Sequence, residues 1–224
     1  IRAIAPEQEI HASTQQTIAS AEAANFLKPL GFNRVVLARE LSLRQIQDIA
    51  KATDLELEVF IHGALCVSYS GQCLTSENFG GRSGNRGQCA QSCRLPYKMF
   101  IDGKEKPLSK TPYLFSPRDL SALPLLSELE KIGIASYKVE GRLKTPEYVA
   151  AVSKAYRTVI DKKDTTPFMQ SALETLFSRG LSPGFLKGVN HTELVEGSFS
   201  NHHGEFLGLV EKVSKNAVFI QSKI

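Results

Sequence analysis

The sequence lacks several features by which whole classes of protein are recognised. It has no run of eighteen apolar residues, so it predicts no membrane-spanning helix. Residues 1–10 have neither the basic nor the apolar stretch of a secretory signal peptide. The hydrolase patterns G-x-S-x-G and H-E-x-x-H are absent as well. We therefore expect a soluble, cytoplasmic protein without a membrane partner.

A large excess of charge of one sign is also missing. The chain has 27 Lys and Arg against 23 Asp and Glu, and this net charge of +4 permits an RNA partner without predicting one. With 42% apolar residues, the 224-residue chain can fill the core of one domain, or of one domain and part of another. Because the first residue is Ile and residues 217–224 read as an unpartnered strand, we expect a piece of a longer chain.

Cysteine is scarce, and all of it lies in one segment, as Cys66, Cys73, Cys89 and Cys93. Several kinds of site compete for these residues. Disulfides are typical of secreted proteins, which nothing else in the sequence indicates. Structural zinc prefers two closely spaced pairs, and only the last two cysteines approach that spacing. Four unrelated buried cysteines would not explain the clustering.

The residues around the cysteines favour an iron–sulfur cluster over these alternatives. Such a cluster needs four soft thiolates, glycines that let the backbone approach, and cations that balance its negative charge. The loop "GGRSGNRG" supplies the glycines, and Arg82, Arg86 and Arg94 supply the cations. The loop matches neither the P-loop nor the dinucleotide fingerprint, so a nucleotide is weakly supported, whereas an RNA phosphate or a small anion stays open.

Apolar patterns predict strands and helices in alternation. The predicted strands are 8–13, 34–40, 55–65, 113–120 and 134–142. Helices are predicted between them, and the next helix opens with Thr145 as its N-cap and Pro146 in its first turn. Its predicted apolar face carries Val149, Val152, Tyr156 and Val159. This repetition predicts an α/β fold with a parallel sheet, open or closed, followed from about residue 165 by a β-rich module.

An α/β sheet carries its chemistry beyond the carboxyl ends of its strands. We expect the cations there to bind a phosphate or carboxylate and the carboxylates and histidine to move protons. The alternative is a ring of salt bridges that ties the strand ends together. The predicted strand ends carry His11, Gln15, Arg39, Glu58, His62, Lys138, Glu140 and Arg142.

Longer segments resemble one known family. "EVFIHGALCVSYSGQCLTS", "NRGQCAQSCRLPY", "FSPRDL" and "KVEGRLKTPEYVAAVSKAYR" are similar to the signature of the collagenase-like peptidases of family U32. The resemblance covers roughly residues 9–160. "RSGNRGQCAQSCRLPY" with "LFSRGLSPGFLKG" looks most like the branch that modifies 23S ribosomal RNA.

The resemblance implies a fold and a division of the chain. The fold is a partial TIM-like (β/α) barrel followed by a smaller β-rich module. About five of the eight strand–helix units of a full barrel are visible, so the first units are expected to be missing. Residues 1–164 are then the C-terminal part of the barrel, with the four-cysteine motif, and residues 165–224 are a linker and the start of the β-rich module.

The resemblance also implies an activity: C5-hydroxylation of a pyrimidine in RNA, a cytidine of 23S rRNA or a uridine of tRNA. It implies a 4Fe–4S cluster on Cys66, Cys73, Cys89 and Cys93, a need for the iron–sulfur assembly machinery, and prephenate as a co-substrate. A collagenase-like peptidase and a zinc-stabilised RNA-binding module without catalysis are the alternatives. A cysteine that ligates iron cannot serve the peptidase as its nucleophile. The catalytic candidates are Glu58, His62, Glu140 and Arg142, and the substrate-binding candidates are His11, Gln15, Arg39, Lys138, Arg82 and Arg86.

Overall fold

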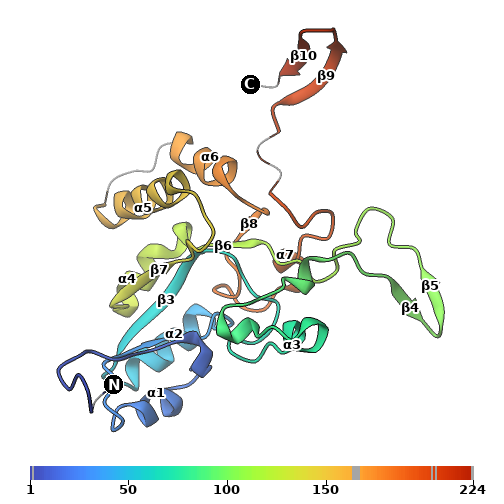
Figure 1. Ribbon diagram of the computed structural model, residues 1–224. Helices are drawn as coiled ribbons and strands as arrows, with labels where there is room; N and C mark the ends of the chain where they lie inside the picture. The colour runs from blue at the N-terminus through green and yellow to red at the C-terminus, as the bar shows by residue number, and fades with distance from the viewer. Residues whose placement is uncertain (2, 163–166, 203, 205, 223–224) are drawn as a thin grey trace.

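The centre of the fold is a mixed sheet (Figure 1), seen in a computed structural model that describes residues 1, 3–162, 167–202, 204 and 206–222. Three strands run parallel in the order β1 (His11–Ala12), β2 (Arg34–Val36) and β3 (Glu56–Gly63). β7 (Ser136–Val139) also pairs parallel with β3. β6 (Asp119–Ser121) pairs antiparallel with the end of β3 and parallel with β8 (Leu181–Ser182).

Helices pack against the apolar side chains of this sheet. Leu57, Val59 and Ile61 of β3 are buried in one core with Ile46 and Leu129 from the helices. α2 contacts both α1 and α4, and α5 contacts α4 and α6, so neighbouring helices support each other (Figure 1). Within the described residues no helix has the length and apolarity that a membrane crossing requires. The helices are α1 (Ala21–Leu27), α2 (Leu43–Lys51), α4 (Leu126–Ile132), α5 (Pro146–Ile160) and α6 (Pro167–Leu176).

The cysteines lie in the long connection between β3 and β6, residues 64–118, which we call the cysteine loop. The loop contains short helical turns and one hairpin, which projects from the body of the molecule in Figure 1. These elements are α3 (Thr75–Gly80), the 3-10 turns Gly84–Arg86 and Ser92–Arg94, and the strands β4 (Met99–Ile101) and β5 (Lys104–Lys106). Two further 3-10 turns, Thr14–Gln16 and Leu123–Leu125, lie outside the loop.

The last part of the chain contains both helix and strand. α6 packs on α5, and β8 joins the central sheet. After the short α7 (His191–Leu194), β9 (Gly208–Val213) and β10 (Val218–Ser222) form an antiparallel hairpin that points away from the sheet (Figure 1). The expected division at residues 164/165 falls within 163–166, outside the described residues, and the domain assignment stays a prediction.

The expected α/β class with a parallel-strand sheet is confirmed, whereas a TIM-type barrel is not. β6 runs antiparallel to β3, and the described strands follow an open path from β1 to β8. β2 is shorter than the expected strand 34–40: it ends at Val36, and Arg39 and Glu40 beyond it bond Ser70 of the cysteine loop. In α5 the predicted Val149 is 41% exposed, and Tyr148 takes its place in the core.

The N-cap of α5 gives a first test of the fold. Thr145 has an extended backbone, and its side chain accepts a hydrogen bond from the backbone N–H of Tyr148, as the sequence predicts. Thr145→Ala leaves that N–H without its partner, so we expect the free energy of unfolding to fall by about 1 kcal/mol. Chemical denaturation measures the change. Ser153→Ala, an exposed site in the middle of the same helix, is the control, and an equal loss there would contradict the capping role.

Candidate metal centre and strand-end cluster

The start of the cysteine loop is held by one buried serine. Ser70 donates from its backbone N–H and its hydroxyl to the carboxylate of Glu40, with the hydroxyl 2.8 Å from Oε2. The hydroxyl also accepts from the backbone N–H of Arg39 at 3.1 Å, and the Ser70 carbonyl accepts from Thr17 Oγ1 at 2.7 Å. The chain between the first two cysteines is therefore fixed to the ends of β1 and β2.

Gly71 makes this anchoring possible. Its φ of 75° lies in the left-handed region, and a Cβ at this position would stand 2.5 Å from the carbonyl oxygen of Gln15. A larger residue would therefore be strained in its backbone and would also clash with backbone. Gln15 reaches the cysteine loop through its main chain, while its side chain is exposed.

All four cysteines are free thiols. Burial raises the pKa of Cys93, and the charges of Cys66, Cys89 and Cys73 act in the same direction, so the other three thiols all lie within electrostatic reach of it. Arg94 acts in the opposite direction and lowers the pKa of Cys93. The Cys89 sulfur accepts a hydrogen bond from the backbone N–H of Gln91 at 3.3 Å.

The donor set fits a metal centre in its chemistry. Four free thiols, a backbone N–H directed at sulfur and a neighbouring buried cation are the groups that surround a thiolate-ligated cluster. Among the described residues, no three His, Cys, Asp or Glu side chains are close enough to hold a metal ion as they stand. Metal binding at this donor set would therefore require the cysteine loop to draw its thiols together.

Arg94 is the buried cation beside the thiols. Its guanidinium donates to the hydroxyl of Ser116 at 2.9 Å, to the carbonyl of Pro117, and to the carbonyl of Leu65 at 3.3 Å. Burial and, after it, the charge of Arg179 lower the pKa of Arg94 to about 10, although Cys93, Asp119 and Cys66 act in the opposite direction. Arg94 therefore ties the two ends of the cysteine loop to each other.

A second group of charges, the strand-end cluster, comprises Asp119, Arg179, Glu140 and Lys144. Asp119 and Arg179 form a buried ion pair in which the carboxylate accepts from the guanidinium and from the backbone N–H of Arg179 at 3.1 Å. This pair joins β6 to the residues before β8. Glu140 follows β7, and its carboxylate accepts from the backbone N–H of Arg142 at 3.2 Å.

Lys144 is the unusual member of this cluster. Its ammonium nitrogen lies 2.8 Å from the centroid of the Phe177 ring and 5.4 Å from that of Tyr148. Burial lowers the pKa of Lys144 to about 8, with Asp119 and Glu140 raising it and Arg179 and Arg94 lowering it. Among the described residues it has no carboxylate in ion-pair contact. Lys144 is thus able to exchange a proton near neutral pH.

His62 lies in the core rather than on an open rim. The ring is 1% exposed and packs against Tyr148 and Tyr156, and its Nδ1 is 3.3 Å from the Tyr156 hydroxyl. That hydroxyl donates to the carbonyl of Ile61 at 2.7 Å and accepts from the backbone N–H of Ala122. Burial lowers the pKa of His62 to about 4, so the ring is neutral near pH 7.

This low pKa predicts a pH dependence of stability. The unfolded chain takes up a proton at His62 near pH 6.5, whereas the folded chain does so only near pH 4. As the pH falls through that window, the free energy of unfolding should decrease by up to about 3 kcal/mol. Denaturant titrations at about pH 7.5, 6, 5 and 4, which cover this window, measure the decrease. His62→Gln should flatten it, and an unchanged slope would show that other groups are responsible.

Glu58 of β3 and Lys138 of β7 form an ion pair, and Lys138 and Arg39, which follows β2, both lie over the Phe60 ring. Burial raises the pKa of Glu58, but hydrogen bonds from Lys138 and Ser136 and the charges of Lys138 and Arg34 outweigh this, so the pKa is lowered. Lys138 Nζ lies 2.8 Å from Glu58 Oε1. This geometry is that of the salt-bridged alternative, although the catalytic and substrate-binding roles of these residues stay predictions.

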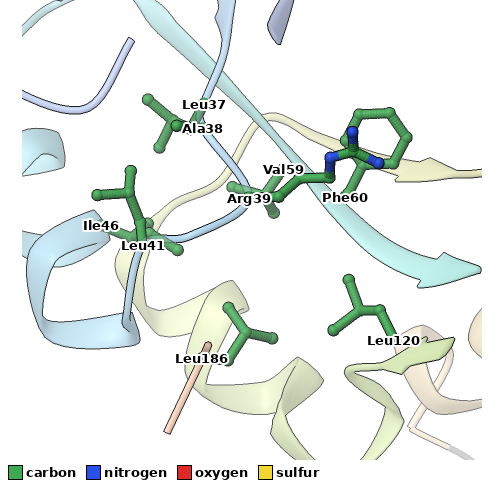
Figure 2. A pocket seen from close by; sticks show the side chains of 9 residues that line it. All are labelled: Leu37, Ala38, Arg39, Leu41, Ile46, Val59, Phe60, Leu120 and Leu186. Atoms are coloured by element: carbon green, nitrogen blue, oxygen red, sulfur yellow. The ribbon is translucent and has the colours of Figure 1, made fainter. Parts of the chain in front are cut away.

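Arg39 points toward Phe60, as Figure 2 shows, with its guanidinium carbon 5.2 Å from the ring centroid. Its Nη1 donates to the carbonyl of Ala64 at 3.2 Å, while its Nε is buried and has no partner within the described part of the chain. The adjoining cavity in Figure 2 has a volume of about 10 Å³, which accommodates at most one water molecule. Arg39 therefore does not line a substrate-sized cavity there.

The remaining candidates lie at the surface. His11 is exposed, and its Nε2 lies 3.5 Å from Oε2 of Glu9. Arg82, Arg86 and Arg142 are exposed, and none has an ion-pair partner in the described part of the chain. Arg142 nevertheless approaches the cysteine loop, because a Cβ on Gly87 would stand 3.2 Å from its Nη1. The structure thus brings Arg142 to the loop of Arg82 and Arg86. Glu58, Lys138 and Arg39 lie apart from them, around Phe60.

The sequence reasoning did not assign Asp119, Arg179 or Lys144. Asp119 stands inside "FSPRDL" and Lys144 inside "KVEGRLKTPEY". In both segments a charged residue next to a predicted strand could have indicated a site residue. Arg179 stands inside "LFSRGLSPGFLKG", but the strand that follows it has only two residues.

Fold and site together define an α/β protein with a thiol-rich loop beside a cluster of charges that contains a buried ion pair. The sequence profile of peptidase family U32 matches residues 1–196, and the chain belongs to this family. No solved structure matches the chain.

Curated relatives carry names of different kinds. A tRNA hydroxylation protein P1 of Bacillus subtilis is 38% identical over 225 residues, which is 93% of this chain and 53% of the relative. A 23S rRNA 5-hydroxycytidine synthase of Escherichia coli is 40% identical over 228 residues, 94% of this chain and 34% of the relative. A collagenase of Porphyromonas gingivalis is 34% identical over 201 residues, which is 80% of this chain and 48% of the relative. The chain thus spans about half, or less, of the length of these relatives.

Proposed function

We propose that this chain carries the metal-binding and RNA-binding part of an iron–sulfur enzyme that hydroxylates C5 of a pyrimidine in RNA, with a cytidine of 23S rRNA as the first candidate. The observation that carries the proposal is that all four cysteines are free thiols in one loop, with the other three in electrostatic reach of Cys93. The names of the tRNA- and rRNA-modifying relatives support the RNA substrate.

In this proposal Cys66, Cys73, Cys89 and Cys93 hold a 4Fe–4S cluster that the iron–sulfur assembly machinery delivers. The cluster supplies one-electron redox chemistry next to the substrate. Arg94 and the backbone N–H of Gln91 are the nearby groups that favour a negatively charged centre over a neutral one.

The surface of the cysteine loop has the groups that a single-stranded RNA needs. Arg82, Arg86 and Arg142 have no carboxylate to neutralise them within the described residues, so they are available for phosphates. Tyr69 and Phe79 are 67% and 69% exposed in the same loop. Exposed aromatic rings can stack on a base that leaves its own stack, which chemistry at C5 requires.

The strand-end cluster is the proposed place of proton handling. Lys144 can donate or accept a proton near neutral pH, and Glu140 lies in electrostatic reach of it. His62 is neutral and buried, so its proposed role is to hold the Tyr156 hydroxyl in place rather than to transfer a proton to the substrate. Prephenate, expected from the resemblance, is the proposed co-substrate, and the cations of this cluster are its candidate partners.

The experiment is an anaerobic purification of the full-length protein, followed by assays for iron, acid-labile sulfide and zinc and an absorption spectrum. RNA from a host that lacks its own enzyme is compared by mass spectrometry with and without the protein. We expect about four irons and four sulfides per chain, and a pyrimidine that gains one oxygen atom.

Three results would overturn the proposal. A colourless, iron-free protein that binds RNA would favour the zinc module, and one that cleaves gelatin would favour the peptidase that the Porphyromonas relative's name indicates. An iron-loaded protein that leaves tRNA and rRNA unchanged would remove the RNA substrate.

A further inference from the structure

Arg94 is a buried cation that forms no ion pair within the described part of the chain; the Asp119 carboxylate is in electrostatic reach of it but is itself paired with Arg179. Its side chain is 9% exposed, and its three hydrogen bonds go to a hydroxyl and two carbonyls, all of them neutral. No carboxylate among the described residues forms an ion pair with it. Arg179, which is also buried, is paired with Asp119. A buried charge that is hydrogen-bonded but not neutralised is costly unless an anion accompanies it in the functional state.

The thiols are the groups placed to provide that anion. Arg94 directly follows Cys93, and its Nη2 holds the carbonyl of Leu65, the residue before Cys66. Cys66 and Cys93 are both within electrostatic reach of the guanidinium. Ser116 and Pro117, at the other end of the cysteine loop, accept hydrogen bonds from the guanidinium and hold it inside the protein beside the thiols.

We propose that Arg94 is the internal counter-charge of the metal centre, a positioning residue that stabilises the centre's more negative, reduced state. The inference rests on the proposed cluster. When the centre accepts one electron its negative charge increases by one, and a fixed cation in a medium of low dielectric favours that form. Arg94 therefore raises the reduction potential of the centre and slows the loss of its metal.

The test removes the charge in two independent ways. Arg94→Gln deletes the cation, and Ser116→Asp places a carboxylate where the Ser116 hydroxyl now accepts from the guanidinium. Ser116→Asn is the matched control for the second change, since it has nearly the same shape and no charge. Arg94→Lys keeps the cation, and Arg44→Gln, an exposed arginine on α2, controls for a change of net charge.

The anaerobically purified full-length protein is titrated with dithionite and redox mediators, and the reduced centre is followed by electron paramagnetic resonance. We expect Arg94→Gln and Ser116→Asp to lower the equilibrium constant for reduction about tenfold, which is about 59 mV for a one-electron couple. Both should also lose iron to a chelator faster than wild type. Arg94→Lys, Ser116→Asn and Arg44→Gln should stay near wild type in both measurements.

The outcomes separate this inference from the proposed function. A wild-type protein that holds no iron overturns the proposed function and this inference with it. An iron-loaded wild type whose potential is the same in Arg94→Gln overturns the role of Arg94 alone. If Arg94→Gln does not fold, equal potentials for Ser116→Asp and Ser116→Asn overturn it instead.

Discussion

Asp119→Asn is expected to destabilise this protein more than any other single loss of charge we consider, by about 3–5 kcal/mol in the free energy of unfolding. The carboxylate is 2% exposed and accepts from the Arg179 guanidinium and its backbone N–H. Asparagine would leave a buried guanidinium without its counter-ion, and it would put a donor where only an acceptor fits. Denaturant unfolding followed by circular dichroism measures the loss.

Asp161→Asn is the matched control for Asp119→Asn. Asp161 also pairs with an arginine, Arg157, but both partners are exposed and lie four residues apart at the C-terminal end of α5, where Asp161 is the C-cap. Such a pair contributes only about 0.3–0.5 kcal/mol. The double variant Asp119→Leu with Arg179→Met should recover much of the loss, because it removes both charges together. Equal effects at Asp119 and Asp161 would show that the buried pair does not hold β6 to β8.

Cys66→Ala and Cys93→Ala are each expected to remove the metal centre and, with it, RNA modification. A change next to a ligand typically costs 10–100-fold in metal affinity, so the loss of a ligand should cost about a hundredfold or more. Iron per chain should fall from about four to near zero, and the absorption of the cluster should disappear. Mass spectrometry of the RNA should show the hydroxylated pyrimidine reduced by a similar factor.

Ser68→Ala controls for a change in the same loop, since Ser68 lies between Cys66 and Cys73 and supplies no thiol. It should keep wild-type iron content and activity. Full RNA hydroxylation by Cys66→Ala or Cys93→Ala would contradict the metal centre as the source of the redox chemistry. Normal iron with lost activity in both would instead point to cysteines that react directly.

Local sequence determined the elements that depend on neighbouring residues. Thr145 and Pro146 predict the start of α5 because capping is decided within one turn. Ile46 and Ile49 predict the buried face of α2 because helical spacing places them together. The four cysteines were visible as one group because they are close in the sequence.

Only the tertiary structure decided which charges meet. His62 contacts Tyr156, 94 residues away, and becomes a neutral core residue instead of a group on an open rim. Asp119 meets Arg179 across 60 residues because β6 lies between β3 and β8. A spacing pattern describes neighbours along the chain, whereas desolvation and ion pairing depend on neighbours in space. The sequence by itself therefore determined the thiols and the caps, and the path of the chain through the sheet determined the electrostatics around them.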